Sequence, residues 1–239
     1  MTRFTGFTWT HYRALFADSR MLMIVIDTIL LALLSSLVAT IVGTLGALGI
    51  ASRRAQRVQT TLLTLNNILM VSPDVIIGAS FLILFTSLGI GLGFGSVLIS
   101  HIAFSIPIVV LLVLPKVEEL DPALLNAAQD LGANRWQTFS RVVIPFILPG
   151  ILSGFFMAFT YSLDDFAVTF FVTGNGFTTL AVEIYSRARQ GISLEINALS
   201  AVMFLFSLLL VSGYYFLNRY SRRHRQKQKR RHKKEALLR

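Results

Sequence analysis

Charged side chains are rare in the apolar stretches of this sequence, and those that occur there are aspartates. Asp164 and Asp165 are the only charged residues between positions 142 and 182, and Asp74 is the only one between positions 58 and 115. A carboxylate inside hydrocarbon costs several kcal/mol, so such residues usually face a cavity or a partner. We therefore regard these aspartates as candidates for a polar path, the alternative being that they cap broken helices or join subunits.

The two neighbouring aspartates lie in a polar pattern that fits one side of a helix. Ser162, Asp165 and Thr169 follow one another at steps of three and four residues, and Tyr161 lies four residues before Asp165. Carboxylates beside an aromatic face suit an ammonium chain, because charge pairing is joined by a cation–π contact of about 0.5–2 kcal/mol. The sequence thus predicts a substrate path formed by Asp165, Asp164, Tyr161, Ser162, Thr169 and Asp74.

The composition is that of an integral membrane protein. Hydrophobic residues make up 54% of the chain and charged residues only 14%, against about 25% charged in a typical soluble domain. Apolar runs of about 20 residues match a hydrocarbon layer of roughly 30 Å, in which helices are the default because each pairs its own backbone. We predict an all-α membrane bundle with five spans, at about 22–50, 62–88, 96–115, 147–172 and 195–217.

Several single residues refine these spans. Gly43, Gly46 and Gly49 near the end of the first span would allow close helix contact. Alternate glycines from 89 to 95 predict a turn between the second and third spans. We interpret His101 as an interfacial histidine and not as a ligand. The five spans contain no Lys or Arg, which an anion path would require.

The net charge of +10 comes from the C-terminal tail. Residues 219–239 hold eleven basic residues and one acid, whereas residues 1–218 hold eleven of each. Basic residues after a last span are the ordinary cytoplasmic anchor, and they also attract anionic lipid. We therefore predict a membrane domain over 1–218 and a cytoplasmic tail over 219–239, with no role in nucleic-acid binding.

The absence of cysteine excludes disulfides and thiolate metal sites, and no metal or cofactor is predicted.

The segment 116–149 connects the third and fourth spans on the cytoplasmic side. Asp121 suits the cap of a helix that begins at Pro122, and Gly132 suits the left-handed position that ends it. We predict a second short helix over about 135–143 that ends before Pro145. Both helices have apolar faces, which either pack on the membrane domain or dock a partner.

This segment resembles the cytoplasmic loop of ABC importer permeases, in which Glu-Ala-Ala, three residues, Gly, nine residues and Ile-x-Leu-Pro follow in order. The corresponding residues here are Asn126, Ala127, Ala128, Gly132, Val142, Ile144 and Pro145, with Asn126 in place of Glu. The resemblance implies that 116–149 is the coupling segment of a permease and is seated in a cleft of an ATP-binding subunit.

Other stretches, such as VSPDVIIGASFLILF and YSLDDFAVTFFVTG, are similar to the PotC-type permeases of spermidine/putrescine importers. The resemblance implies a MetI-like fold in the cell (plasma or inner) membrane, two copies of an ATP-binding subunit, a second permease of PotB type, and an extracytoplasmic polyamine-binding protein. Such permeases usually have six spans. We therefore expect that the family's first span is absent here, through either a late start codon or a genuine five-span variant.

Other classes of function fit the sequence less well. It contains no phosphate loop of the type G-x-x-x-x-G-K-[ST], so the chain is not expected to be an enzyme and a separate subunit would hydrolyse ATP. An intramembrane serine protease lacks support, because Ser153 has no glycine two residues before it. An ABC permease for another small solute stays open, as does an ion-coupled carrier, although the inverted repeats of such carriers are not visible.

Overall fold

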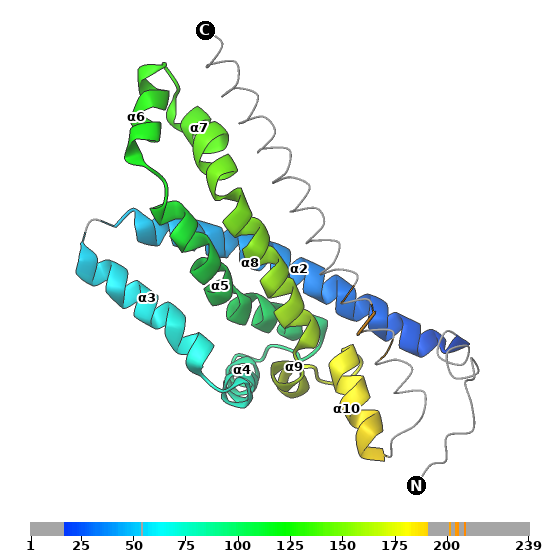
Figure 1. Cartoon of the computed structure of the whole chain (residues 1–239). Coiled ribbons are helices and arrows are strands. Elements are labelled where there is room, and N and C mark those ends of the chain that lie inside the picture. The colour runs from blue at the N-terminus through cyan, green and yellow to red at the C-terminus, as the bar shows by residue number, and fades with distance from the viewer. Residues whose placement is uncertain (1–16, 54, 191–200, 202–203, 206–207, 209–239) are drawn as a thin grey trace. The chain divides into compact units, whose positions relative to one another are not determined.

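The computed structural model describes residues 17–53, 55–190, 201, 204, 205 and 208. The residues discussed below lie in one compact unit, Arg20–Ser186. The described elements are all helical (Figure 1): α2 Ser19–Ala51, α3 Gln56–Val71, α4 Asp74–Ser87, α5 Phe94–Glu118, α6 Pro122–Asp130, α7 Arg135–Thr138, the π-helix η1 Phe139–Val143, α8 Ile144–Asp164, α9 Ala167–Val172 and α10 Leu180–Gln190.

Three long apolar helices form the framework of this unit. They are α2, α5 and the continuous helix Arg135–Asp164, and each is long and apolar enough to cross a membrane. With 33 residues, α2 is about 50 Å long, which exceeds the roughly 30 Å of the hydrocarbon layer. The predicted all-α membrane class and the first and third spans are confirmed. The fifth predicted span, 195–217, and the tail 219–239 lie outside the described residues, apart from the four single positions given above.

The second predicted span, 62–88, is not one straight helix. It consists of α3 and α4, which are bent by 102° with respect to each other. The break falls at Ser72 and Pro73, both of which have extended backbone angles. Proline has no N–H to continue the helix, and its ring disfavours the helical conformation of the residue before it. The predicted span is therefore broken at this proline, and the bent pair α3–α4 is either one broken span or a re-entrant loop.

The fourth predicted span, 147–172, also breaks. Helix α8 ends at Asp164, Asp165 has extended angles, and α9 begins at Ala167. The predicted polar stripe along one continuous helix is therefore wrong. The physical reason is that the Asp165 carboxylate accepts hydrogen bonds from the backbone N–H groups of Val168 and Thr169, which offers the chain a new helix start at this point.

The predicted end of the short helix before Pro145 is also wrong, because the chain stays helical there. Helix α7 continues through η1 into α8 without interruption. The N–H of Ile144 bonds the carbonyl of Phe139, five residues earlier, which is the spacing of a π-helix. This wider turn directly precedes Pro145, whose missing N–H and bulky ring an ordinary α-helix accommodates poorly.

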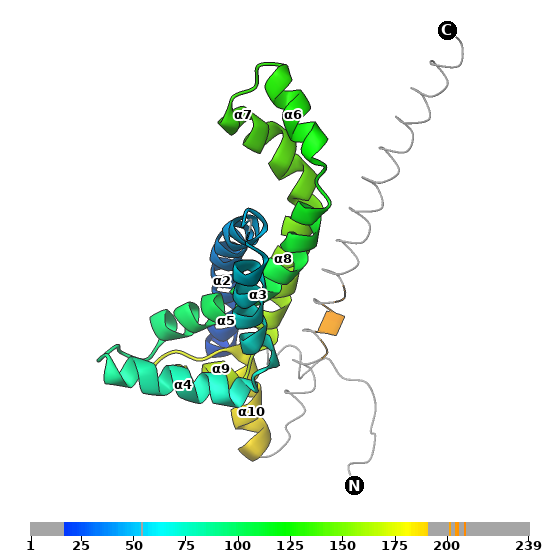
Figure 2. The same cartoon turned by 90° about the vertical axis from the view of Figure 1, so that its left-hand side faces the viewer.

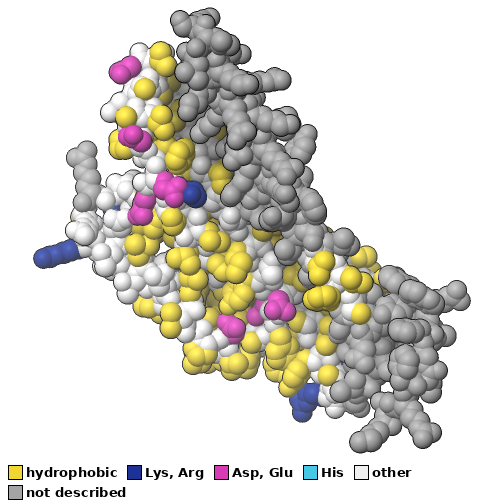
Figure 3. Space-filling view, in the orientation of Figure 1, with side chains coloured by type: hydrophobic (Ala, Val, Ile, Leu, Met, Phe, Trp, Pro, Cys, Tyr) yellow, Lys and Arg dark blue, Asp and Glu magenta, His cyan; other side chains and the backbone are white. Residues whose placement is uncertain are grey.

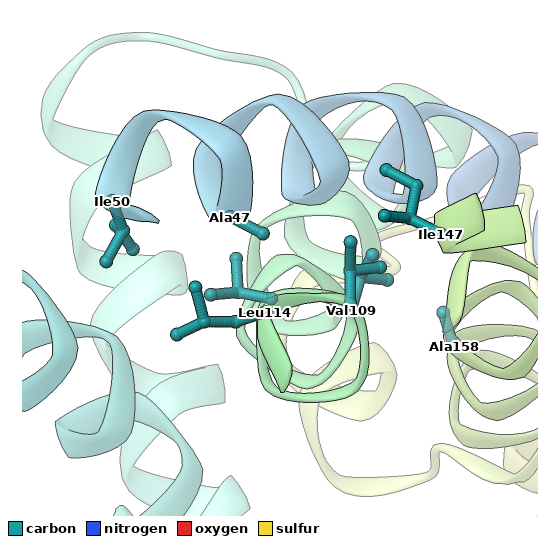
Figure 4. Close-up of a cluster of buried hydrophobic side chains, with 8 residues drawn as sticks. Ala47, Ile50, Val109, Leu114, Ile147 and Ala158 are labelled. Atoms are coloured by element: carbon teal, nitrogen blue, oxygen red, sulfur yellow. The ribbon is translucent and has the colours of Figure 1, made fainter. Parts of the chain in front are cut away.

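Small residues bring the long helices together. A Cβ on Gly43 would lie 2.7 Å from Val109, so α2 and α5 approach closely there, whereas a Cβ on Gly46 would make an ordinary contact and one on Gly49 would meet nothing. The expected close contact is thus confirmed at Gly43 and wrong at Gly49. Figure 4 shows the buried cluster at this crossing, which includes Ala47, Val109, Leu114, Ile147 and Ala158.

The connection between α4 and α5 has the predicted glycine turn. Gly89 has φ +67° and Gly93 has φ +155°, a region of backbone space that favours glycine. Ser96 closes the start of α5, since its hydroxyl accepts from the Gly93 N–H and also bonds the Val172 carbonyl. This turn therefore joins α5 to the end of α9.

Candidate functional site

The break between α8 and α9 gathers three polar side chains around His101 of α5. His101 is completely buried, with 0% of its surface exposed. Its Nδ1 lies 2.7 Å from Ser162 Oγ, and its Nε2 lies 2.8 Å from Thr169 Oγ1. Asp165 Oδ2 lies 3.4 Å from Nε2. Three of the six predicted path residues therefore meet at a histidine.

Asp165 lies two residues before α9 and accepts hydrogen bonds from its first turn, and it does not present its carboxylate to the surface, since only 6% of its side chain is exposed. Its Oδ2 accepts from the Thr169 N–H and from the Thr169 hydroxyl, each at 2.8 Å, and its Oδ1 accepts from the Val168 N–H at 3.3 Å. The structure thus shows the capping contact that the sequence left as an alternative.

The buried network continues into α2. Ser35 Oγ lies 2.9 Å from Ser162 Oγ, and Ser35 also reaches the Ala32 carbonyl at 3.2 Å. Phe104 covers the network on one side, with ring centroids 4.8 Å from His101 and 4.9 Å from Tyr161. We call Ser35, His101, Ser162, Asp165 and Thr169 the histidine network; its members come from α2, α5, α8, the break and α9.

The other three predicted path residues lie outside this network and are exposed. The Tyr161 hydroxyl donates to Asp74 Oδ1 at 3.0 Å, which joins α8 to the first residue of α4. Asp164 is exposed at the last position of α8. We call Asp74, Tyr161 and Asp164 the exposed trio. In Figure 3, acidic side chains appear within a broad hydrophobic surface, a setting in which carboxylates require water, a cation or a partner.

The segment between α5 and α8 projects two short helices away from the membrane-spanning framework (Figures 1 and 2). The Asp121 side chain accepts from the Ala123 N–H at 2.8 Å, and Gly132 has φ +81°, so the predicted cap and the left-handed end of α6 are confirmed. Asn134 and Gln137 then cap α7 reciprocally.

Val143 and Ile144 of this segment pack against the core of the membrane helices, whereas the large apolar side chains around the bend are exposed. Leu131 is 88% exposed and Trp136 is 71% exposed. Among the motif residues, Asn126, Ala127 and Ala128 lie on α6, Gly132 on the bend, Val142 in η1, and Ile144 and Pro145 at the start of α8. Of the two alternatives, the structure therefore leaves a surface that is open to a partner.

Comparison with known families decides the class of protein. The family of binding-protein-dependent transport system inner membrane components matches residues 39–227, which include α3 to α10 and the whole motif. The chain belongs to this family. It is a membrane permease subunit of an ATP-driven ABC importer, and it is a transport protein, not an enzyme. Such permeases work with ATP-binding, second permease and solute-binding partners.

Several named permeases are similar in sequence to this chain. It is 36% identical to the spermidine/putrescine permease PotC of Haemophilus influenzae over 86% of this chain and 80% of that protein. It is 35% identical to PotC of Escherichia coli K12 over 86% of this chain and 78% of that protein. The putrescine permease PotI of the same strain is 32% identical over 85% of this chain and 74% of that protein.

Solved structures confirm the fold. A chain of a bacterial ABC transporter involved in the import of the acidic polysaccharide alginate has a TM-score of 0.67 and 20% identity, with 87% of this chain and 81% of that chain covered. A chain of the methionine transporter MetNI has a TM-score of 0.62 and 18% identity, with 82% and 95% covered. At these identities the likeness concerns the helical fold alone, and it confirms the expected MetI-like bundle.

Sequence reasoning missed His101 as a member of the site. Its interpretation as an interfacial residue was wrong, because the side chain is buried and bonded at both ring nitrogens. A histidine within an apolar stretch of a permease was itself a usable signal, since ionisable residues in spans usually face other helices.

The polar face of α3 was missed as well. No residue of α3 is buried. Its first turns carry an exposed face made of Gln56, Arg57, Thr60, Thr61, Thr64 and Leu65. The hydroxyls of Thr60, Thr61 and Thr64 donate to carbonyls of their own helix, so their remaining lone pairs stay available as acceptors. The threonines at 60, 61 and 64, at and just before the start of the predicted second span, could have revealed this face.

Proposed function

We propose that this permease forms the translocation path for polyamines of the spermidine and putrescine type. The observation that carries the proposal is the exposed trio, which sets two carboxylates and a tyrosine in an otherwise apolar surface. Ammonium groups pair with carboxylates and also bind aromatic faces. The likeness to PotC and PotI permeases supports the same class of solute.

The charge of the surrounding helices supports a cationic solute. Helices α4, α8 and α9, which carry or adjoin the exposed trio, contain no Lys or Arg. An anionic solute would meet two carboxylates there without a compensating cation. The neutral hydroxyls of Thr60, Thr61 and Thr64 on α3 add further acceptors, beside the positive charge of Arg57 on the same face.

The partners follow from the same proposal. Two copies of an ATP-binding subunit would hydrolyse ATP, and one of them would hold α6 against its surface. A second permease of PotB type would complete the path, and an extracytoplasmic binding protein would deliver the polyamine. This arrangement requires that the segment 116–149 and the C-terminus face the cytoplasm, where the basic tail would also contact anionic lipid.

Transport by the reconstituted complex tests the proposal. Proteoliposomes would contain the permease with its second permease and ATP-binding subunits, with ATP enclosed and labelled spermidine and the binding protein outside. We expect uptake that stops with a non-hydrolysable ATP analogue and is reduced by unlabelled putrescine. Uptake driven by an ion gradient without ATP would contradict the proposal. Uptake of a different solute, with spermidine excluded, would favour the alternative ABC permease.

A further inference from the structure

The histidine network has a defined direction of hydrogen bonding. The Thr169 hydroxyl has one hydrogen, and it donates that hydrogen to Asp165. The contact of 2.8 Å between Thr169 Oγ1 and His101 Nε2 therefore requires that Nε2 is the donor. His101 thus carries a hydrogen on Nε2, the nitrogen that faces α9. Thr169 accepts a hydrogen bond from this nitrogen and donates one to the Asp165 carboxylate.

The other side of the ring completes the network. With the hydrogen on Nε2, a neutral imidazole accepts at Nδ1, so Ser162 donates to it at 2.7 Å. Ser162 then accepts from Ser35 at 2.9 Å. The Ser35 hydroxyl also lies 3.2 Å from the Ala32 carbonyl and so has two acceptors within reach, while the two ring nitrogens are both used. Such a fully satisfied buried network fixes the geometry of its members strongly.

This network spans the point where the chain changes direction. Ser162 precedes the break and Thr169 follows it, while His101 stands on a different helix and bonds to both. Asp165, the residue at the break itself, lies beside the same ring. The imidazole therefore bridges the end of α8 and the start of α9 from the side of α5.

We propose that His101 is a positioning residue of the transport path. It holds the α8–α9 break in one conformation, and the break in turn sets the direction in which Asp164 and Tyr161 face the solute. Asp164 directly precedes Asp165, and Tyr161 directly precedes Ser162, so each exposed residue is bonded in sequence to a member of the buried network. The proposal rests on the proposed function for the identity of the solute, but not for the geometry.

Labelling of a single cysteine tests the geometry without any solute. The chain contains no cysteine, so Asp164→Cys introduces a unique thiol just before the break. A charged, water-soluble methanethiosulfonate would report its reaction rate in the assembled complex. We expect His101→Phe to change this rate by about threefold to tenfold, in line with the loss of one or two buried hydrogen bonds. His101→Gln retains a donor near Nε2 and should stay closer to the parent.

Matched controls separate positioning from a general loss of structure. Thr160→Cys places the reporter on the exposed surface of α8, one turn earlier, where the hydroxyl bonds only its own helix. Its rate should not respond to His101→Phe. Ser100→Ala removes a buried hydroxyl of α5 that bonds the Ser96 carbonyl and not the network, and it should change neither reporter. Equal rates at position 164 with histidine and phenylalanine would overturn the proposal.

Two further results keep the test decisive. If His101→Phe fails to assemble, Thr169→Val removes the acceptor of Nε2 instead, and an unchanged rate at position 164 would overturn the proposal. In transport, the half-saturating spermidine concentration should rise more than the maximal rate falls, whereas a merely structural histidine would lower only the amount of active complex. Failure of the parent complex to transport spermidine would reject the proposed function. The positioning role of His101 would then be decided by the labelling rates alone.

Discussion

The segment 116–149 and the α8–α9 break organise polar and apolar residues in opposite ways. In α6 and α7 the apolar side chains are exposed, and the hydrogen bonds of Asp121 and Asn134 reach only two or three residues along the chain. At the break the polar side chains are buried, and His101 bonds residues 61 and 68 positions away. The first region holds its own shape and exposes a surface, whereas the second depends on two other helices, α2 and α5.

This difference teaches where each region is vulnerable. The segment 116–149, if it couples to an ATP-binding subunit as proposed, should respond to changes in backbone conformation and in its exposed surface. The break should respond to the loss of single hydrogen-bonding atoms, because a buried group left unpaired costs about 1–3 kcal/mol. The following substitutions would sharpen or break this distinction.

Gly132→Val should have the largest effect. A residue with a Cβ at φ +81° costs about 1–2 kcal/mol, and a β-branched residue is a clear outlier there. That cost corresponds to a factor of about 5–30 in the population of the native bend. We expect ATP-dependent spermidine uptake to fall by a similar factor while basal ATP hydrolysis persists. Gly132→Asn is the matched control, since asparagine tolerates this conformation. Equal losses of uptake in both variants would show that the left-handed backbone at Gly132 is not what transport requires.

The neighbouring aspartates provide the next comparison. Asp165→Asn removes one of two acceptor oxygens that are both in use, so it should lower the stability of the complex by about 1–3 kcal/mol and reduce uptake. Asp164→Asn should reduce uptake without changing stability, because its carboxylate is exposed. Thermal unfolding of the purified complex and uptake assays would measure both effects. Identical stability of the two variants would remove the distinction between a buried cap and an exposed path residue.

Tyr161→Phe should have a smaller effect on transport. It removes the donor to Asp74 at an exposed site and keeps the ring, so the loss is about 0.5–1.5 kcal/mol. The half-saturating spermidine concentration should rise by about two- to tenfold. Thr160→Ala is the control, because that neighbouring hydroxyl is exposed and bonds its own helix. An unchanged half-saturating spermidine concentration would show that the exposed trio does not contribute to the path.

Asp121→Ala should have the smallest effect, confined to α6. Loss of an N-cap costs about 0.5–2 kcal/mol, which the short helix would show as faster amide hydrogen exchange. Thermal unfolding of the whole complex should hardly change, since no residue of α6 is buried. Asp121→Asn should preserve the cap. A large drop in global stability would show that α6 is less independent than its contacts indicate.

The two regions also differ in how much of them could be predicted from the sequence. Asp121, Pro122 and Gly132 act within a few residues of the backbone that they shape, so cap, start and end of α6 were all predicted correctly. The apolar lengths of α2 and α5 likewise identified two spans. Pro145 misled the prediction, because a π-helix absorbed its effect without ending the helix.

The site was only half predictable. Periodicity selected Ser162, Asp165 and Thr169, and they do meet, but around a histidine and across a break instead of along one helix. Their assembly requires that α5 places His101 between α8 and α9, and no local pattern encodes that distance. The Tyr161–Asp74 hydrogen bond joins residues 87 positions apart, so the spacing of residues along the sequence could not predict it either.

The uninterrupted helix from Arg135 to Asp164 has a mechanical consequence. Its 30 residues extend for about 45 Å, from the exposed apolar surface around Trp136 to the acidic end beside the break. If an ATP-binding subunit docks at that surface as proposed, a tilt imposed at Trp136 would be transmitted along this helix to Asp164. The wide turn of η1 lies near the Trp136 end, so a bend there would move the longer arm of α8.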